Sequence, residues 1–362
     1  MQSALRKATV GGSVTQVAPM LRSAKLRSLA KINLDLRVLH RRVDGFHELR
    51  TVFQTISLAD TIDISFEPSR RTSLAIEDSL DIPHNLILRA AQAALDAMKI
   101  SGRVQCKLRK RIPMGAGMGG GSSNAAAVLL ALPVLAGKSV EYEKLLALGA
   151  ELGSDVPFFL TGGTAVAVDR GTEFYSVTDI AEEPILVVAP ELHVATGLAY
   201  RALGRGLTLP ESSRIINNFQ LFVRTLVDLR SARAASAFGA NDFEPVVFSQ
   251  YPQLHALFRR LRNIVNGSAA GSSVQRKAAS GVARMTGSGS ALFAVFGSTK
   301  ERDLARRRLE LGLERDRGFH GGRIIPARLV SRRSYQRLWH RQLAGLAVSS
   351  EGIWPPHSRY AR

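Results

Sequence analysis

The feature that most constrains this chain is a glycine run placed between a charged segment and an alanine-rich one. Five of the seven residues from Gly115 to Gly121 are glycine, and Ser122 and Ser123 follow directly. Glycine lets the backbone turn where a Cβ would clash and lets it approach a ligand closely, at a cost in chain entropy. The run therefore predicts a loop that contacts a ligand through its main chain.

The residues after the run predict a helix whose N-terminus faces this loop. Ser123–Leu132 is rich in Ala and Leu, and either Ser122 or Ser123 can cap the helix. The free amides of a helix N-terminus and the positive end of its dipole bind phosphate without any side-chain charge. We therefore expect a phosphate cradle here.

Two common phosphate motifs fit this loop poorly. Gly115–Gly120 formally matches the dinucleotide pattern G-x-G-x-x-G, and Glu141 lies at the distance expected for its acidic residue. However, Arg109–Pro113 is charged rather than a dry first strand, and no regular βαβ repetition follows. The Walker A pattern is excluded because no Gly-Lys-Ser/Thr ends the run.

The hydrophobic pattern of the whole chain predicts an α+β fold, because strands and helices both occur but do not alternate regularly. The expected strands are Leu29–Val38, Thr51–Phe66, Arg103–Ile112, Pro157–Val168, Ile185–Ala189, Leu292–Phe296 and, at an edge, Arg323–Leu329. The expected helices are Asn85–Met98, Ser123–Leu132, Glu141–Leu152, Ile215–Leu229, Tyr251–Val265 and Asp303–Leu313.

We expect four regions along the chain. Residues 1–25 form a basic disordered extension or reflect a start assigned too early, residues 26–182 and 183–330 form two domains, and residues 331–362 form a tail. The first region lacks the apolar core of a secretory signal, but its composition also suits a transit peptide. Asn266–Gly281 reads as a loop, and the tail is either a helix docked by Trp339 or a loose segment.

The charge of the chain indicates an anionic partner. Lys and Arg number 49 against 30 acidic residues, a net charge of +19. Such a charge suits nucleic acid or phosphorylated small molecules. Much of the excess lies near the ends, as in Arg306–Arg308, whereas a nucleic-acid groove needs basic residues along one folded face. The single cysteine, Cys106, excludes a disulfide framework, and no apolar stretch is long enough for a membrane helix.

Four motifs in order resemble the GHMP small-molecule kinases. Pro113–Ala127 resembles their ATP loop, and Met285–Ser290 resembles their third glycine loop. Ala30–Leu34 with Arg41–Leu49, and the aspartate motif Leu152–Phe159, resemble one branch, the 4-diphosphocytidyl-2-C-methyl-D-erythritol kinases. The resemblance covers about residues 28–330. It implies a ribosomal-protein-S5-like N-terminal domain, a ferredoxin-like C-terminal domain and an active site in the cleft between them.

The resemblance also implies a reaction. Enzymes of this branch transfer a phosphoryl group from ATP to the 2-hydroxyl of a CDP-linked methylerythritol, in non-mevalonate isoprenoid precursor synthesis. Asp155 is then the general base, and Lys31 is its cationic partner. Mg²⁺ is expected with ATP, with Ser123 a candidate ligand. The implied ATP-binding residues are Pro113, Met114, Gly115, Ala116, Gly117, Met118, Gly119, Gly120, Gly121, Ser122 and Ser123.

The same resemblance places the second substrate. Asn33 would bind the polyol, Phe46 would stack on cytosine while His47 reads its edge, and Tyr200 would form a second aromatic wall. Phe46 is a departure, because the family usually has tyrosine there; stacking survives the change since it depends on the ring face. Near the transferred phosphate the resemblance places Gly287, Ser288 and Gly289.

Two alternative functions stay open. One is a sister GHMP kinase acting on mevalonate, homoserine or a sugar; the other is a basic nucleic-acid-binding protein. If the chain is an enzyme, we expect it to be a monomer or homodimer without membrane or specific nucleic-acid partners. It would be cytoplasmic, or plastid-located if residues 1–25 are a transit peptide.

Overall fold

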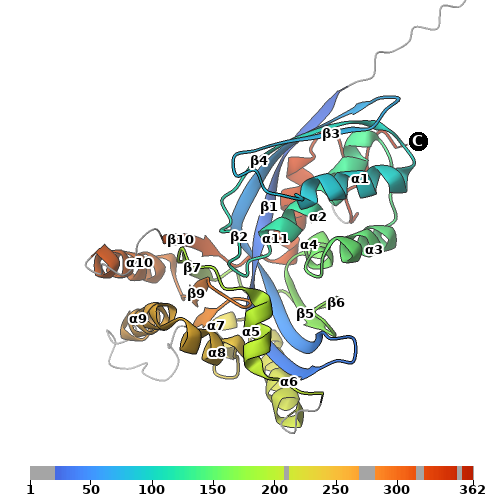
Figure 1. The fold of residues 1–362 in the computed structure, drawn as a ribbon. Coiled ribbons are helices and arrows are strands. Elements are labelled where there is room, and N and C mark those ends of the chain that lie inside the picture. The colour runs from blue at the N-terminus through green and yellow to red at the C-terminus, as the bar shows by residue number, and fades with distance from the viewer. Residues whose placement is uncertain (1–20, 208–211, 269–281, 315–321, 349–352, 362) are drawn as a thin grey trace, which may run out of the picture.

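The computed structural model describes residues 21–207, 212–268, 282–314, 322–348 and 353–361, which form two sheets covered by helices (Figure 1). The N-terminal sheet is built around β2, which pairs with β1 along one edge and with both β4 and β5 along the other. Its strands are β1 (Arg22–Arg41), β2 (His47–Pro68), β3 (Ser73–Asp78), β4 (Gly102–Arg109), β5 (Thr164–Val168) and β6 (Glu173–Ser176).

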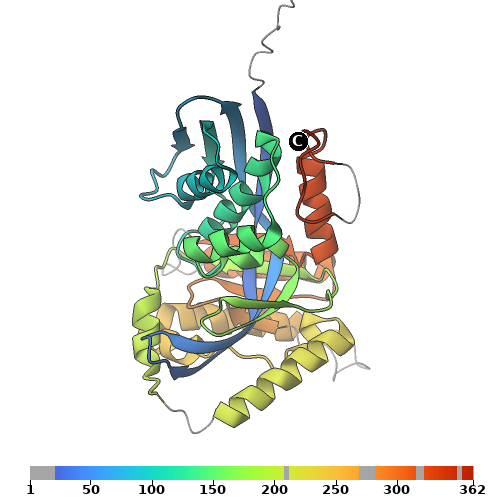
Figure 2. The ribbon, with the colours of Figure 1, turned by 90° about the vertical axis from the view of Figure 1, so that its right-hand side faces the viewer.

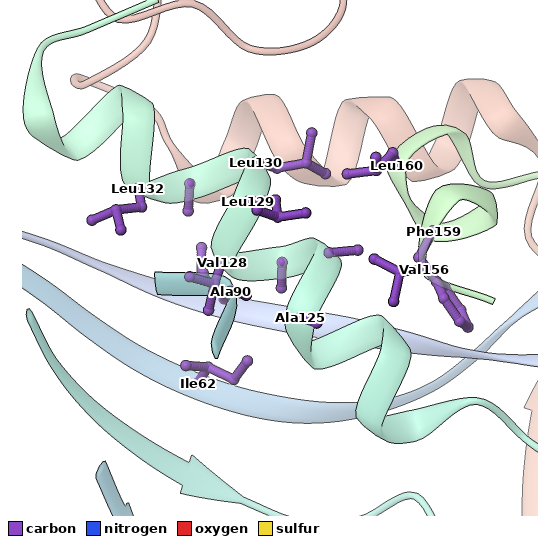
Figure 3. Packing of buried hydrophobic residues seen from close by; sticks show 14 of the residues in the cluster. Ile62, Ala90, Ala125, Val128, Leu129, Leu130, Leu132, Val156, Phe159 and Leu160 are labelled. Carbon is purple, nitrogen blue, oxygen red and sulfur yellow. The ribbon is translucent and has the colours of Figure 1, made fainter. Parts of the chain in front are cut away.

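Four helices accompany the N-terminal sheet: α1 (Leu86–Met98), α2 (Gly120–Ala136), α3 (Tyr142–Leu152) and α4 (Val156–Thr161). Helix α2 is apolar on all sides, which is the pattern of a helix enclosed by other elements. Every residue from Ser123 to Leu135 is buried. Figure 3 shows Val128 and Leu129 of α2 in the core with side chains from strand β2 and helices α1 and α4. The helix that carries the glycine loop therefore has a rigid position.

The second sheet has the strand order of a ferredoxin-like domain. It contains β7 (Pro184–Ala189), β8 (Val282–Met285), β9 (Leu292–Val295) and β10 (Arg323–Arg328), ordered β10-β7-β9-β8 and antiparallel throughout. Strand β10 lies at an edge, as its sequence predicts. The accompanying helices are α5 (Thr196–Leu203), α6 (Ser212–Leu229), α7 (Ala232–Ala235), α8 (Phe243–Gln250), α9 (Pro252–Ser268) and α10 (Thr299–Glu314).

The long hairpin of β1 and β2 joins the two halves. Leu26 and Leu29 of β1 pack in the core around α2, whereas Leu36 and Val38 pack with residues of the second sheet. Figure 1 shows these strands, in blue, extending from one half of the molecule into the other. Both ends of the hairpin are thus fixed by separate hydrophobic cores. The expected domain boundary at 182/183 falls in the connection between β6 and β7.

The C-terminal tail is a docked helix. Helix α11 (Arg332–Gln342) starts at the N-cap Ser331 and buries Tyr335 and Trp339 in the N-terminal core. Figure 2 shows α11, in red, standing beside the N-terminal half. Trp339 is 1% exposed, which decides between the two alternatives for the tail in favour of the helix. No helix within the described ranges has the length and hydropathy needed to cross a membrane.

Three expected boundaries are wrong. Pro157–Val168 is not one strand, because Val156–Thr161 forms α4 before β5 begins; a short apolar run does not distinguish a buried strand from a buried helix. Strand β1 begins at Arg22, so the N-terminal fold starts before residue 26. Residues 266–268 of the expected loop belong to α9; the rest of that loop, 269–281, and residues 1–20 lie outside the described residues.

Candidate active site

A pocket of about 850 Å³ lies where the two halves meet, between the β1–β2 hairpin, α5 and two glycine loops. Its wall includes most of the residues that the resemblance assigned to catalysis and substrate, but few of those assigned to ATP. The predicted site residues that line it are Lys31, Asn33, Phe46, His47, Gly117, Gly119, Asp155, Tyr200, Gly287 and Ser288.

Lys31 and Asp155 converge in this pocket from positions far apart in the sequence. Lys31 lies on β1, and its amide donates to the carbonyl of Met118 in the glycine loop at 3.1 Å. Asp155 is the N-cap residue of α4. The Lys31 Nζ lies 3.5 Å from Asp155 Oδ2, and their side chains are 6% and 29% exposed. The carboxylate is therefore held beside a cation yet stays accessible from the pocket.

The ammonium of Lys31 is in a dry environment. Burial lowers its pKa from the usual 10.5, while the charge of Asp155 and a hydrogen bond to it act in the opposite direction. The ammonium also donates to Asn33 Oδ1 at 2.9 Å and lies over the Phe53 ring, 4.6 Å from its centroid. These partners keep a charge in a place where an unpaired charge would be costly.

Asn33 lines the pocket on the same face of β1 as Lys31, but the protein already uses its side chain. Its Nδ2 donates to Thr51 Oγ1 at 2.8 Å, and its Oδ1 accepts from the amide of Gly287 at 3.0 Å and from Lys31. The amide of Asn33 in turn donates to Thr286 Oγ1 at 3.0 Å. Asn33 therefore ties the lysine to the third glycine loop, and contact with the polyol stays a prediction.

The first glycine loop owes its shape to alternating glycines. Gly115, Gly117 and Gly119 all have positive φ, whereas the side chains of Ala116 and Met118 between them are buried in the core. A Cβ on Gly117 would stand 2.4 Å from the carbonyl oxygen of Thr286, so the two loops touch through their main chains. The glycines are thus required both for φ and for close approach.

Helix α2 starts earlier than its serines suggest. It begins at Gly120 with Gly119 as N-cap, and no side chain caps it. Ser123 is buried, and its hydroxyl donates to the carbonyl of Leu29 at 2.7 Å. The expectation that Ser122 or Ser123 caps the helix is therefore wrong. The amides at its first turn remain free of an intrahelical partner, as a phosphate cradle requires.

The residues do not form an evident metal site. Ser123 faces the carbonyl of Leu29, and within the described residues no group of three His, Cys, Asp or Glu side chains is placed to hold a metal ion. A cage of three or more such ligands is therefore not present in this part of the chain.

At the aromatic end of the pocket, Tyr200 pairs with His47, whereas the resemblance predicts that it forms a wall opposite Phe46. The rings of His47 and Tyr200 stack on each other, 4.8 Å apart at 25°, and Tyr200 meets Phe243 edge-on. Phe46 is 55% exposed, with the guanidinium of Arg170 over its ring at 4.8 Å. Four aromatic rings, those of Phe46, His47, Tyr200 and Phe243, thus line this end, and Phe46 is more than half exposed.

Burial and nearby charges shift the pKa values of two of these rings, His47 and Tyr200. Burial lowers the pKa of His47, and the positive charges of Arg41 and Arg205 add to this effect. Burial together with the Asp155 carboxylate raises the pKa of Tyr200 to about 12. At neutral pH both rings are therefore uncharged, which suits recognition of a neutral base.

Two residues that support the glycine loops were not identified from the sequence. Asn241 Nδ2 donates to the carbonyls of Met285 and Gly287, and so holds the third glycine loop. Asp60 is fully buried; it accepts from the amides of Arg111 and Ile112 just before the first loop. Asp60 shares the inward-facing register of the buried isoleucines on β2, and a carboxylate there signals partners. No comparable signal marked Asn241.

Comparison with known proteins identifies the family of this chain. Residues 85–163 match the family model described as GHMP kinases N terminal domain. A protein of Solibacter usitatus named 4-diphosphocytidyl-2-C-methyl-D-erythritol kinase is 48% identical over 94% of this chain and 98% of its own length. A protein of Geobacter metallireducens with the same name is 34% identical over 78% of this chain and 92% of its own.

Solved structures extend this agreement to the fold. The crystal structure of a 4-(cytidine 5'-diphospho)-2C-methyl-D-erythritol kinase has a TM-score of 0.64 and 33% identity, over 84% of this chain and 98% of that one. Homoserine kinase from Cytophaga hutchinsonii has a TM-score of 0.61 at 16% identity over 89% of this chain and 100% of its own, a likeness of fold alone. The two-sheet architecture is thus that of an ATP-using GHMP phosphotransferase, and with relatives this similar along nearly its whole length the chain belongs to the 4-diphosphocytidyl-2-C-methyl-D-erythritol kinases.

Proposed function

We propose that the chain transfers the γ-phosphoryl group of ATP to the 2-hydroxyl of 4-diphosphocytidyl-2-C-methyl-D-erythritol, a step of non-mevalonate isoprenoid precursor synthesis. The observation that carries the proposal is the pairing of Lys31 with Asp155 at 3.5 Å in a pocket bordered by two glycine loops. The relatives named above supply the substrate, and the pairing supplies the chemistry.

Asp155 is the general base in this proposal. One carboxylate oxygen of Asp155 takes the proton of the substrate hydroxyl. The hydroxyl oxygen meanwhile forms a bond to the γ-phosphorus, and the bond between that phosphorus and the ADP oxygen breaks. The nearby Lys31 ammonium stabilises negative charge developing on the hydroxyl oxygen. Phosphoryl transfer depends mainly on such alignment and charge neutralisation.

ATP phosphates are held by main-chain amides in this proposal. The first glycine loop and the N-terminus of α2 supply the donors, with the third loop (Thr286–Ser290) packed against them. We expect Mg²⁺ to arrive bound to ATP and water, since the described side chains offer no dedicated site. The roles proposed for the protein residues do not depend on any of them binding the metal ion.

Cytosine recognition uses the aromatic end. The exposed face of Phe46 is free to stack on the base, and neutral His47 is free to exchange a hydrogen bond with its polar edge. Tyr200 already stacks on His47, so it supports the histidine from behind in the described state.

The test measures ADP release from ATP with a panel of acceptors. The CDP-linked methylerythritol should be phosphorylated, whereas methylerythritol, mevalonate, homoserine and galactose should not. Asp155→Asn should lower kcat by about 10²–10⁴-fold, the usual effect of losing a general base. Asp228→Asn, at an exposed position on α6, is the matched control. Near-normal turnover of Asp155→Asn would refute the assigned role, and preference for another acceptor would refute the substrate.

A further inference from the structure

Arginines line the part of the pocket that surrounds the His47–Tyr200 pair. Arg41 is the last residue of β1, and its amide donates to the carbonyl of Gly206 at 2.7 Å. That hydrogen bond brings the end of β1 beside the segment that follows α5. Arg201 lies in the last turn of α5, and Arg205 lies just after the helix. All three arginines line the pocket. Arg201 and Arg205 are neighbours in the sequence, and only folding brings Arg41 beside them.

Their charges act on the pocket rather than only on solvent. The charges of Arg41 and Arg205 are both felt at His47, where, after burial, they help to lower the pKa of the imidazole. Arg201 Nη1 lies 4.0 Å from the Cβ position of Gly197, another residue of the pocket wall. A positive field therefore exists next to the predicted base site.

Few acidic residues of the described ranges neutralise this field. Among those ranges Arg205 has one partner, Asp242 Oδ2, at 3.4 Å, and its Nε is buried without an acceptor. Arg41 and Arg201 form no ion pair with any acidic residue of the described ranges, and Asp155 is the only acidic residue among those that line the pocket. Gathered like charges and an orphaned buried donor are unfavourable unless an anion binds.

Arg170, the fourth arginine of the wall, serves another purpose. It lies over the Phe46 ring and has Asp169 as a neighbour at 3.7 Å. Its charge is thus matched and its position explained by the ring. The arginines of the wall whose charges are not matched in this way are Arg41, Arg201 and Arg205.

We propose that Arg41, Arg201 and Arg205 form the subsite for the diphosphate group that links cytidine to the polyol. The inference rests on the proposed function and assigns the part of the substrate between its base and its reacting hydroxyl. Arginine presents its N–H donors in a planar fork that matches phosphate oxygens. The buried Arg205 Nε gains an acceptor when the diphosphate binds. The subsite would select diphosphate-linked acceptors over uncapped polyols.

Calorimetric titration without ATP separates this subsite from the base site. Cytidine, CMP, CDP and ADP are titrated into the wild-type chain and into Arg41→Gln, Arg201→Gln and Arg205→Gln. Each variant should lose about tenfold to hundredfold affinity for CDP, the value of a charged hydrogen bond, and less than about twofold for cytidine. The exposed Arg224→Gln on α6 is the matched control. Loss for ADP instead of CDP would place ATP phosphates here and overturn the assignment.

Steady-state kinetics supply a second readout. Each variant should raise KM for the CDP-linked polyol while KM for ATP stays at its wild-type value. Equal losses for cytidine and CDP would mean that the arginines only support the fold, and unchanged CDP affinity would mean that they bind no diphosphate; either result overturns the subsite. If the wild-type chain bound neither cytidine nor CDP, the proposed function would fail together with the subsite, so the two failures are distinguishable.

Discussion

At the scale of single residues, the site depends on Lys31 keeping its proton in a dry environment. Asp155 and Asn33 contact its ammonium, and the ring of Phe53 lies below it. Burial nevertheless outweighs these contacts and lowers the pKa of Lys31. The charge that the proposed mechanism assigns to Lys31 is therefore held at some cost to the fold, which is common at functional sites.

A pH profile tests this balance. We expect kcat to fall on the alkaline side with an apparent pKa below 10.5, because Lys31 loses its proton early. Between its native pKa and 10.5 the unfolded chain binds the extra proton, so this group makes stability rise with pH in that window. In Lys31→Arg the guanidinium stays charged, and the alkaline fall in kcat should disappear. The same fall in that variant would assign the titration elsewhere.

Asp60 is a second residue whose burial has a measurable consequence. Its carboxylate accepts from the Lys110 ammonium and from Asn124 Nδ2, besides the two amides before the loop. In Asp60→Ala, Lys110 would be left as an uncompensated buried charge, which costs about 3–5 kcal/mol of unfolding free energy. Asp63→Ala on the same strand removes an exposed pair with Arg109 and should cost less than about 1 kcal/mol. Urea unfolding measures both, and equal losses would contradict the buried-charge argument.

At the scale of elements, the C-terminal segment supports the helix that carries Asp155. Helix α4 has only six residues, so the carbonyls at its end lack helical partners. Tyr335 Oη donates to the carbonyl of Phe159, and Trp354 Nε1 donates to that of Leu160 at 2.9 Å. The segment from α11 onward thus completes the short helix from outside.

Replacing Trp354 tests this support. Trp354→Phe keeps an aromatic ring but removes the donor to Leu160, so the free energy of unfolding should fall by about 1–3 kcal/mol. Tyr360→Phe removes only an exposed, long hydrogen bond to Gly345 and should change the free energy of unfolding very little. Thermal and urea unfolding of both variants give the comparison. A Trp354→Phe chain as stable as wild type would show that the carbonyl does not depend on the indole.

At the scale of the whole molecule, the active site exists where the two halves touch. The first glycine loop belongs to the N-terminal half and meets the third loop of the C-terminal half at Gly117 and Thr286. Asn33 accepts a hydrogen bond from the amide of Gly287 in the third loop, while Asn241 donates to the carbonyl of the same residue. The pocket's geometry therefore depends on how the halves pack, not on either sheet alone.

Gly117→Ala tests this junction. The added Cβ would meet the Thr286 carbonyl at 2.4 Å in a backbone with φ of +77°, so the loops must separate. We expect KM for ATP to rise and kcat/KM to fall at least tenfold. A tenfold loss corresponds to about 1.4 kcal/mol, which is within the cost of such backbone strain. Gly345→Ala has a similar φ of +82° but open space around it, and should cost stability without loss of activity. Comparable activities of the two variants would refute the junction.

Much of the fold could be predicted, because periodicity and glycine placement are local signals. The strand preceding the first loop, the presence of helix α2 and the edge position of β10 follow from such signals. Helix α4 could not be distinguished from a strand, since its apolar run is short and enclosed on all sides. The start of α2 was misplaced because glycine at the N-cap here serves close approach rather than capping.

For the site, the sequence by itself determined the residue types from which we predict the chemistry: a glycine run before a helix, and, through the family motifs, a lysine, an aspartate and an aromatic pair. These depend on residue type and local spacing. Only the tertiary structure decided that Lys31 lies 3.5 Å from Asp155, that His47 stacks on Tyr200, and that three arginines share one wall. Such distances arise from packing between segments more than a hundred residues apart, and no local pattern encodes them.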